Sequence, residues 1–276
     1  TMDGIRFFSV PTRPMNRFFR GESKRAYHKL RKISKPVSLI HNHGIWMAPN
    51  RYARYAATFH DKPFVVSPRG MLSGWSMNYK SQKKFLAWHL YEKRNLEYAD
   101  LFHATSHQEA EAIRRAGFQK TPIVVIPNGV DLPEKTQSIP RSFLEQDYPE
   151  LKGKKWVLFL SRIHAKKGID DLVWAWSQVS RDFSDWHLIL AGPDLTGYRE
   201  HVQKLVLDLE IPHSVTLTGS LGGSKRLAAL SNCEVLVLPS HNENFGLVVA
   251  EALSFSKPVI TTRGTPWQEL ENSNCG

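Results

Sequence analysis

This sequence has few cysteines, no long apolar run and no dinucleotide-binding fingerprint. Its two cysteines among 276 residues, Cys233 and Cys275, do not make a disulfide framework, so a reducing cytoplasm is the expected compartment. No apolar run approaches the ~18–20 residues that span a bilayer, so we expect no transmembrane helix. No Gly-x-Gly-x-x-Gly motif follows a predicted strand, which disfavours a nicotinamide or flavin dehydrogenase.

Acidic residues are scarce in the first half of the chain. Apolar residues make up 41% and charged residues 23% of the whole sequence, which is ordinary for a globular protein. Residues 1–133 nevertheless carry a net charge of +13, whereas residues 134–276 carry −2. The basic excess therefore lies wholly in the first half.

Residues 13–35 are the most basic segment, with nine Lys or Arg residues and Glu22 as the one acid. Because apolar residues such as Tyr27 and Leu30 lie among them, a helix over Glu22–Ile33 would be basic and amphipathic. Anionic lipid attracts such a segment by roughly 1 kcal/mol per basic residue near the surface. We find no motif that reads nucleic acid, so nucleic acid is not an expected partner. We expect a peripheral position on the inner membrane face, and the alternative is a solvated helix face.

Strand-like and helix-like segments alternate along most of the chain. The predicted strands are Ile5–Val10, Val37–His41, Phe64–Ser67, Leu101–Thr105, Ile123–Ile126, Trp156–Leu160, His187–Ala191, Val215–Leu217, Val235–Leu238 and Val259–Thr261. The predicted helices are Glu22–Ile33, Arg51–Phe59, Ser81–Tyr98, His107–Ala116, Ile169–Arg181, Tyr198–Leu209, Ser224–Leu230 and Leu247–Ser254. This alternation indicates parallel sheets covered by helices, which is an α/β fold.

The alternation breaks once, in a polar stretch that contains Pro140 and Pro149. We therefore predict two doubly wound domains with a ligand cleft between them. The predicted boundaries are 1–133 for the first domain, 134–153 for a linker and 154–276 for the second domain.

Residues 235–251 give the strongest site signal. The apolar run Val235–Leu238 predicts a buried strand, and a helix follows from Gly246. Free N–H groups at the start of that helix favour a phosphate. Glu243 and Glu251 favour neutral hydroxyls, because a carboxylate accepts two strong hydrogen bonds from a diol. The arrangement fits a nucleotide-sugar, with one Glu on the hexose and the other on the ribose. The alternative is one acid at a helix start and another on the solvated surface.

Two cations lie on another predicted strand-to-helix loop. Arg162 follows the strand Trp156–Leu160, and Lys167 comes just before a helix that Gly168 opens. The carboxyl ends of strands are where α/β sheets place ligands. The planar Arg fork and the Lys point charge make a suitable pair for a diphosphate. A solvated basic loop is the alternative.

These motifs carry a resemblance to the retaining glycosyltransferases of family 4. In the second half the chain resembles that family at Arg162…Lys167-Gly168, Ala191-Gly192-Pro193, Thr218-Gly219-Ser220 and Pro239-Ser240…Glu243-Asn244-Phe245-Gly246…Glu251-Ala252, with Ile126-Pro127-Asn128-Gly129-Val130-Asp131 before them. Upstream, the chain is similar to the first domain of bacterial polysaccharide-assembling members at His41-Asn42-His43-Gly44-Ile45-Trp46, Ser67-Pro68-Arg69-Gly70-Met71-Leu72 and His103-Ala104-Thr105-Ser106.

The resemblance implies a GT-B fold, in which two Rossmann-like domains face a cleft. It also implies transfer of a hexose, with retention, from a nucleoside-diphosphate sugar to a lipid-linked or polysaccharide acceptor. We expect a UDP-linked donor and no metal, because Arg162 and Lys167 would neutralise the departing diphosphate and the sequence has no Asp-x-Asp. The resemblance places Glu243 on the hexose hydroxyls rather than making it a nucleophile.

The resemblance also implies a set of binding residues. His43 and Arg69 are expected on the acceptor side, where His43 would hydrogen-bond a sugar hydroxyl. Two histidines on one strand end, His41 and His43, are weak support for a metal site without a third ligand. The residues expected to bind the donor are Gly219, Asn244, Phe245, Gly246, Leu247 and Glu251.

Two further expectations concern the extent of the chain and its activity. Relative to the family, the chain is expected to be trimmed at both ends, so that activity of these 276 residues alone is in doubt. One alternative function is a nucleotide-binding module without turnover. Another is a basic membrane-associated protein whose α/β part is a scaffold.

Overall fold

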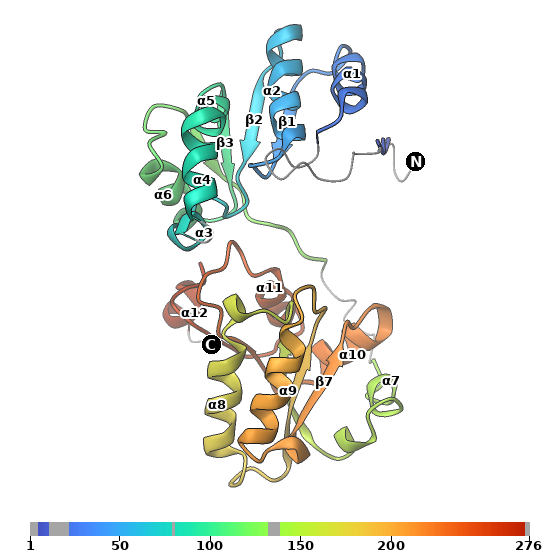
Figure 1. Cartoon of the computed structure of the whole chain (residues 1–276). Helices are drawn as coiled ribbons and strands as arrows, with labels where there is room; N and C mark the ends of the chain where they lie inside the picture. The colour runs from blue at the N-terminus through green and yellow to red at the C-terminus, as the bar shows by residue number, and fades with distance from the viewer. Residues whose placement is uncertain (1–4, 11–21, 79–80, 132–138, 274–276) are drawn as a thin grey trace. The chain divides into compact units, whose positions relative to one another are not determined.

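The computed structural model describes residues 5–10, 22–78, 81–131 and 139–273 (Figure 1). The chain divides into two compact units, Thr1–Pro127 and Asn128–Gly276. Each unit has its own parallel sheet and its own apolar core.

The first unit is built on a four-stranded parallel sheet with the order β1-β2-β3-β4. Its strands are β1 (Ile40–His43), β2 (Phe64–Ser67), β3 (Leu101–Ala104) and β4 (Ile123–Val125). Its helices are α1 (Lys24–Ile33), α2 (Ala48–His60), α3 (Gly74–Asn78), α4 (Ser81–Ala87), the π-helix η1 (Trp88–Glu92), α5 (Lys93–Leu96) and α6 (His107–Arg115).

Local sequence explains where the helices of the first unit begin. Ser106 is the N-cap of α6, because its side chain accepts a hydrogen bond from the backbone N–H of Glu109 at 3.1 Å. Ser23 caps α1 in the same way through Ala26 N. Pro49 occupies the first turn of α2, where its missing N–H costs nothing. The buried core between sheet and helices contains Phe64, Val66, Phe102, Leu96 and Ile113.

The second unit has a five-stranded parallel sheet with the order β7-β6-β5-β8-β9. Its strands are β5 (Lys155–Leu160), β6 (Trp186–Ala191), β7 (Val215–Gly219), β8 (Val235–Leu238) and β9 (Val259–Thr261). Its helical elements are α7 (Ser142–Glu145), η2 (Pro149–Leu151), η3 (Ala165–Lys167), α8 (Ile169–Val179), α9 (Tyr198–Asp208), η4 (Pro212–Ser214), α10 (Gly223–Asn232), α11 (Leu247–Ser254) and α12 (Glu269–Asn272).

This strand order makes the second sheet doubly wound. The chain moves outward from β5 to β6 and β7, and then returns to the other side of β5 to form β8 and β9. Right-handed crossovers therefore put α8 and α9 on one face and α10 and α11 on the other. The winding direction reverses between β5 and β8, which are adjacent and parallel. The carboxyl ends of these two strands form the topological switch point, where α/β sheets bind ligands.

Burial on both faces explains why the central strands of the second unit read as continuous apolar runs. Leu158, Leu188, Ile189 and Leu236 have no more than a trace of exposed surface. Within the described ranges, no helix is both long and apolar enough to cross a membrane.

The predicted elements agree closely with the structure in most of the chain, but the short helices α3, α7 and α12 were not predicted, and three predicted elements differ. Residues 6–10 form no strand, because Phe7 and Phe8 are exposed and their alternation buries no face. The predicted helix Ser81–Tyr98 is split by the π-helix η1. The strand predicted at Val37–His41 lies at Ile40–His43, because Val37 and Leu39 stay exposed.

The segment predicted as a linker, 134–153, contains part of the second core. Residues 132–138 lie outside the described ranges, but α7 packs against α10 and η2 in the second unit. Leu144 and Leu151 are fully buried there, and Trp156 donates its indole N–H to Leu151 O at 3.1 Å. Prolines and polar residues suggested a linker, but two buried leucines belong to the second unit.

We predict that Leu144→Ala lowers the free energy of unfolding of the second unit by about 2–5 kcal/mol, because it leaves a cavity in the core. The neighbouring Phe143 on α7 is 43% exposed and serves as a matched control. Phe143→Ala should cost much less. Denaturant unfolding of the full chain measures both, and equal losses would mean that α7 is not part of the core.

Candidate functional site at the switch point of the second sheet

The switch point of the second unit brings together two predicted site loops. The β5–α8 loop carries Arg162 and Lys167, and the β8–α11 loop carries Glu243. Backbone hydrogen bonds tie the loops together, since His241 N donates to Lys166 O at 3.1 Å. The sequence signals from residues 162–168 and 239–251 therefore belong to one place in the fold.

A buried ion pair joins these loops. Lys167 is 6% exposed, and its Nζ donates a hydrogen bond to Glu243 Oε2. Ser240 Oγ donates to the same carboxylate oxygen at 3.4 Å, and Asn244 N donates to Glu243 Oε1 at 3.3 Å. Removing either partner of a buried pair leaves an uncompensated charge. Each of Lys167 and Glu243 is therefore needed for the other to lie in the interior.

Two glycines permit the close approach of three strand-end loops. Gly168 has φ +65°, and a Cβ there would lie 2.1 Å from Pro239 O at the end of β8. Gly192 has φ +152°, and a Cβ there would lie 1.7 Å from Ser161 O after β5. Any larger residue would force the backbones apart, so these glycines set the position of the loop that carries Lys167.

Arg162 lies exposed on the same loop as Lys167. Burial, together with the positive charges of Arg162, Lys166 and Lys167, lowers the pKa of His164 below its usual range. The His164 side chain accepts from Lys166 N at 3.0 Å, which starts the turn η3. The loop thus presents a positive potential at the carboxyl end of β5, which suits an anionic ligand.

The start of α11 lies beside the ion pair. Gly246, at the N-cap, has φ +74°, and a Cβ there would come within 3.2 Å of Glu243 Cγ. Trp267 donates its indole N–H to Phe245 O, and the two rings are 5.3 Å apart. Leu247, the first residue of α11, is 42% exposed. The N–H groups of this turn therefore begin at an open, well-fixed position.

Glu251, one turn further into α11, does not contact Glu243 in the structure. Its Oε2 accepts a hydrogen bond from Arg226 of α10, with both side chains partly exposed. Gly219, at the end of β7, has φ +73° and would place a Cβ 3.4 Å from Arg199 Nη1. Arg199 in turn donates to Leu217 O at 2.8 Å.

Sequence reasoning missed Ser240, Arg226 and Arg199 as neighbours of the predicted residues. Ser240 lies three residues before Glu243 in the same motif, so its contact with Glu243 could have been predicted from their spacing. Arg226 and Arg199 come from helices elsewhere in the chain, and only the tertiary fold brings them to Glu251 and Gly219.

The two predicted acceptor-side residues meet in the first unit. Arg69 Nη2 and His43 Nδ1 are 3.0 Å apart, and Arg69 Nε donates to the same nitrogen at 3.3 Å. Arg69 has φ +54°, a left-handed conformation that is uncommon for a side chain of its size. The buried carboxylate of Glu109 holds this turn, because its Oε1 accepts from Gly70 N at 2.6 Å and its Oε2 from Thr105 N at 2.8 Å.

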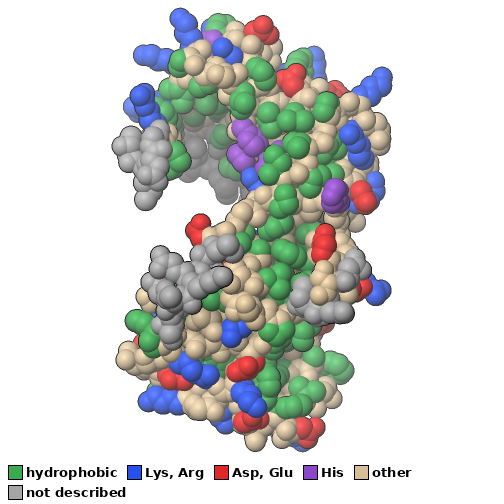
Figure 2. Space-filling model, turned by 180° about the vertical axis from the view of Figure 1, so that it is seen from behind, with side chains coloured by type: hydrophobic (Ala, Val, Ile, Leu, Met, Phe, Trp, Pro, Cys, Tyr) green, Lys and Arg blue, Asp and Glu red, His purple; other side chains and the backbone are tan. Residues whose placement is uncertain are grey.

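Histidine side chains gather on this unit, as Figure 2 shows. The rings of His41 and His43 are 4.2 Å apart, and those of His41 and His103 are 5.5 Å apart. Burial, then the charges of the neighbouring histidines and Arg69, lowers the pKa of His41 to about 4. Burial and Arg69 also lower the pKa of His43. Both imidazoles are therefore uncharged at neutral pH.

Metal ligation has no geometric support in the part of the chain that the structure describes. No group of three or more His, Cys, Asp or Glu side chains there is arranged to hold an ion. The independence from metal stays a prediction.

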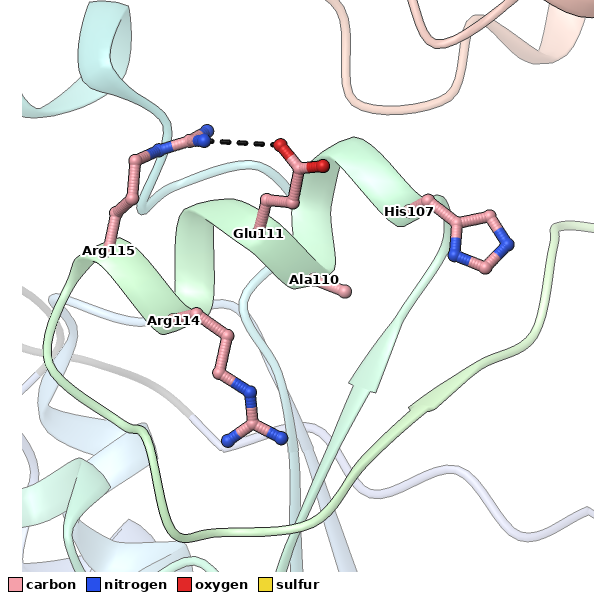
Figure 3. Close-up of a pocket in the computed structure, with 5 residues that line it drawn as sticks. All are labelled: His107, Ala110, Glu111, Arg114 and Arg115. Atoms are coloured by element: carbon pink, nitrogen blue, oxygen red, sulfur yellow. Dashed lines mark hydrogen bonds and ion pairs between the residues drawn. The ribbon is translucent and has the colours of Figure 1, made fainter.

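A depression of about 350 Å³ lies on α6 and contains none of the predicted site residues (Figure 3). Glu111 and Arg115 form an ion pair at 3.2 Å on the helix surface. Arg114 turns away to donate to three backbone carbonyl oxygens, those of Phe118, Gln119 and Thr121. These contacts fix the C-terminal end of α6, and we assign the depression no ligand.

Two parallel α/β units, one of them doubly wound with an ion pair at its switch point, define a two-domain α/β protein. Comparison with family models then identifies the family. Residues 1–129 match the model for a "Glycosyl transferase 4-like domain", and residues 140–274 match that for "Glycosyl transferases group 1". The chain belongs to the glycosyltransferases that these two models together describe, as the resemblance to family 4 implied.

Curated relatives match parts of the chain. A D-inositol 3-phosphate glycosyltransferase of Pseudarthrobacter chlorophenolicus is 33% identical over 168 residues, which cover 60% of this chain and 40% of the relative. A glycogen synthase of Mycobacterium tuberculosis is 26% identical over 251 residues, covering 86% of this chain and 56% of the relative. The matches thus span about two-fifths to somewhat over half of these relatives.

Solved structures show the fold. HepE of Anabaena in complex with UDP and glucose has a TM-score of 0.72 and 22% identity, covering 88% of this chain and 64% of that chain. Its complex with UDP-glucose has a TM-score of 0.71, again with 22% identity and 88% coverage, here with 65% of that chain. The predicted fold of two Rossmann-like domains, the GT-B fold, is confirmed.

We predict that Gly168→Ala destabilises the second unit more than Gly153→Ala. Both glycines have a left-handed φ near +65–69°, which costs a non-glycine residue about 1–2 kcal/mol. Only at Gly168 does the added Cβ meet another backbone, whereas nothing lies within 4 Å of it at Gly153. We expect an additional loss of about 1–3 kcal/mol in denaturant unfolding. Equal losses would contradict the close approach of the η3 turn to Pro239.

Proposed function

We propose that the protein is a glycosyltransferase that moves a hexose from a nucleoside-diphosphate sugar, UDP-linked by preference, to a saccharide hydroxyl. The observation that carries this proposal is the meeting of Lys167 and Glu243 at the switch point, beside the open start of α11, with Arg162 exposed on the same loop as Lys167. Family membership and the UDP-glucose bound to HepE support the choice of donor.

In this proposal the cations hold the diphosphate. Arg162 is exposed and offers a bidentate fork, while the N–H groups at the start of α11 offer further donors to phosphate oxygens. Lys167 is buried beside this position and paired with Glu243, so it contributes to the diphosphate site mainly by holding the two loops together. As the bond from the sugar C1 to the diphosphate breaks, the electron pair leaves with UDP. Fixed positive charge stabilises that leaving group, so no metal is required.

The two carboxylates bind the neutral parts of the donor, which are the hexose and the ribose. Glu243 binds hexose hydroxyls, with its orientation set by Lys167, Ser240 and Asn244. Glu251 binds the ribose, with its orientation set by Arg226. Donor contacts from Gly219, Phe245 and Leu247 complete the set that the family resemblance implies. The acceptor hydroxyl attacks on the face that the diphosphate leaves and gives its proton to a departing diphosphate oxygen, so that the configuration at C1 is retained.

We predict that Glu251→Gln weakens UDP binding by about 1.5–3 kcal/mol, the scale of a hydrogen bond to a charged group. Glu243→Gln should weaken UDP-glucose more than it weakens UDP, because its ligand is the sugar and the change also unpairs Lys167. Isothermal calorimetry with both ligands on folded variants measures this. The opposite pattern would mean that the two carboxylates have exchanged roles, and no UDP binding by the wild type would remove the proposal. UDP-glucose binding without sugar release would identify a binding module instead of an enzyme.

We further propose that the first unit meets an anionic membrane surface, where a lipid-linked acceptor would lie. The helix α1 supports this, because none of its residues is buried, and Lys24, Arg25 and Lys32 are exposed. Arg31 packs its guanidinium 3.4 Å from the ring centroid of Phe59, and Phe59 is itself 57% exposed. Residues 13–21 of the predicted basic segment lie outside the described ranges. The described part presents charge with apolar surface beside it, which suits a lipid headgroup layer.

We predict that binding to phosphatidylserine-containing liposomes is lost progressively as salt rises from about 0.1 to 1 M, because the screening length falls from ~10 to ~3 Å. The triple variant Lys24→Ser, Arg25→Ser and Lys32→Ser should reduce co-sedimentation. A matched control removes three exposed cations from the second unit, by changing Lys152, Arg181 and Lys204 to Ser. Equal loss in both variants would indicate a general charge effect and contradict a lipid-binding face on α1.

A further inference from the structure

Four polar groups of the first unit form one continuous hydrogen-bonded row across the carboxyl ends of β1, β2 and β3. His41 Nε2 lies 2.7 Å from Ser67 Oγ, and Ser67 Oγ lies 2.9 Å from His103 Nδ1. His103 Nε2 lies 2.9 Å from Ile126 O, just beyond β4. The row begins at the exposed His41, passes through the fully buried Ser67 and ends on a backbone carbonyl.

The carbonyl at the end of this row fixes the direction of every hydrogen bond in it. Because a carbonyl oxygen only accepts, His103 Nε2 must carry the proton that it donates to Ile126 O. In a neutral imidazole the other nitrogen then accepts, so the Ser67 hydroxyl donates to His103 Nδ1. Having used its proton there, Ser67 Oγ accepts from His41 Nε2–H. The neutral form of His41 is therefore left with a bare, hydrogen-bond-accepting Nδ1.

The neighbouring His43 is fixed in a different way. Arg69 has only donors, and its Nη2 and Nε approach His43 Nδ1 at 3.0 and 3.3 Å. His43 Nδ1 must therefore be bare, and the ring proton must lie on Nε2. The free nitrogen of His43 is a donor, whereas the free nitrogen of His41 is an acceptor.

These two rings lie against each other and carry no charge at neutral pH. Their centroids are 4.2 Å apart and their planes differ by 34°. Partial burial is the first cause that lowers the pKa of each ring. The charges of His43, His103 and Arg69 follow for His41, and those of Arg69 and His103 follow for His43. Both side chains are exposed on β1. The surface thus presents one neutral acceptor and one neutral donor, close together and each in a fixed tautomer.

We propose that Ser67, held by His103, is a positioning residue that fixes the tautomer of His41, so that His41 and His43 together bind a saccharide hydroxyl. A hydroxyl both donates and accepts, so it donates to His41 Nδ1 and accepts from His43 Nε2–H. The identification of the saccharide as the acceptor substrate rests on the proposed function. The tautomers and the hydroxyl-binding pair depend only on contacts within the first unit.

Imidazole ¹⁵N spectra of the full chain at pH 8 test the tautomers directly, since unperturbed histidines are neutral there. His→Asn variants at positions 41, 43 and 103 assign the signals. We expect all three rings to carry the proton on Nε2. In Ser67→Ala the signals of His41 should move towards a mixture of tautomers, while His103 keeps its Nε2–H because Ile126 O still accepts it. His60, whose Nε2 meets Arg31 O at 2.7 Å, is the internal control and should not change.

The hydroxyl-binding step needs a second measurement with a defined probe. Titration with methyl α-D-glucoside should shift the Nδ1 signal of His41 and the Nε2–H signal of His43 in the wild type. Ser67→Ala should raise the dissociation constant about threefold to tenfold, as the loss of one neutral hydrogen bond does. Ser67→Thr retains the hydroxyl and should restore both the tautomer and the affinity.

Three outcomes would overturn the proposal. They are a proton on Nδ1 of His41 in the wild type, an unchanged His41 in Ser67→Ala, and unperturbed His41 and His43 signals at saturating glucoside. UDP titration of the same sample separates this result from the proposed function. UDP binding that persists when the glucoside fails leaves the donor site standing, and failed UDP binding removes the proposed function without changing the tautomers.

Discussion

The ion pair between Lys167 and Glu243 is the interaction on which the arrangement of the second unit's strand ends depends. It joins the loop after β5 to the loop after β8, which are the two strands where the winding of the sheet reverses. Both charges lie mostly out of water, where their attraction offsets a large loss of hydration only while the geometry holds. Ser240 and Asn244 satisfy the remaining carboxylate positions, and the two loops are thereby held in one register.

A different interaction stabilises the corresponding edge of the first sheet. There the anchor is the buried carboxylate of Glu109, which takes backbone N–H groups from two loops and leaves Arg69 in a left-handed turn. The polar side chains at this edge are largely neutral imidazoles rather than ion pairs. At this edge the second unit thus combines a neutral ion pair with the exposed cation Arg162, whereas the first presents mainly uncharged imidazole donors and acceptors beside Arg69.

Most of the fold was predictable from the sequence because buried parallel strands leave a strong signal. The run Val235–Leu238 is apolar throughout and Val259–Thr261 is β-branched throughout, and the structure has strands with those bounds. Prediction failed at Phe7 and Phe8, where an apolar pattern buries no face of a strand. It also failed at Leu144 and Leu151, which are buried although no apolar run surrounds them. A hydrophobic pattern along the sequence cannot show that two isolated leucines fill a core.

The candidate site was predictable in part, for a related reason. Lys167 and Glu243 were found from their places after two strands, and sheet topology then made them neighbours. The pairing of Glu251 with Arg226, and the row from His41 through Ser67 to His103, join residues that are 25 to 36 positions apart in sequence. Spacing along the chain carries no information about such contacts, since they depend on the register of adjacent strands and on the rotation of helices against them.

The two glycines that let backbones touch have a consequence for changing this protein by design. Gly168 brings the β5 loop against the end of β8, and Gly192 brings the β6 loop against the same β5 loop. The main chains of the three loops are therefore packed against one another with almost no free space between them. A graft that replaces one loop with that of another enzyme would have to match the backbone path of the other two. If the proposed donor site lies here, an exchange of its specificity would accordingly require all three loops to be transplanted together.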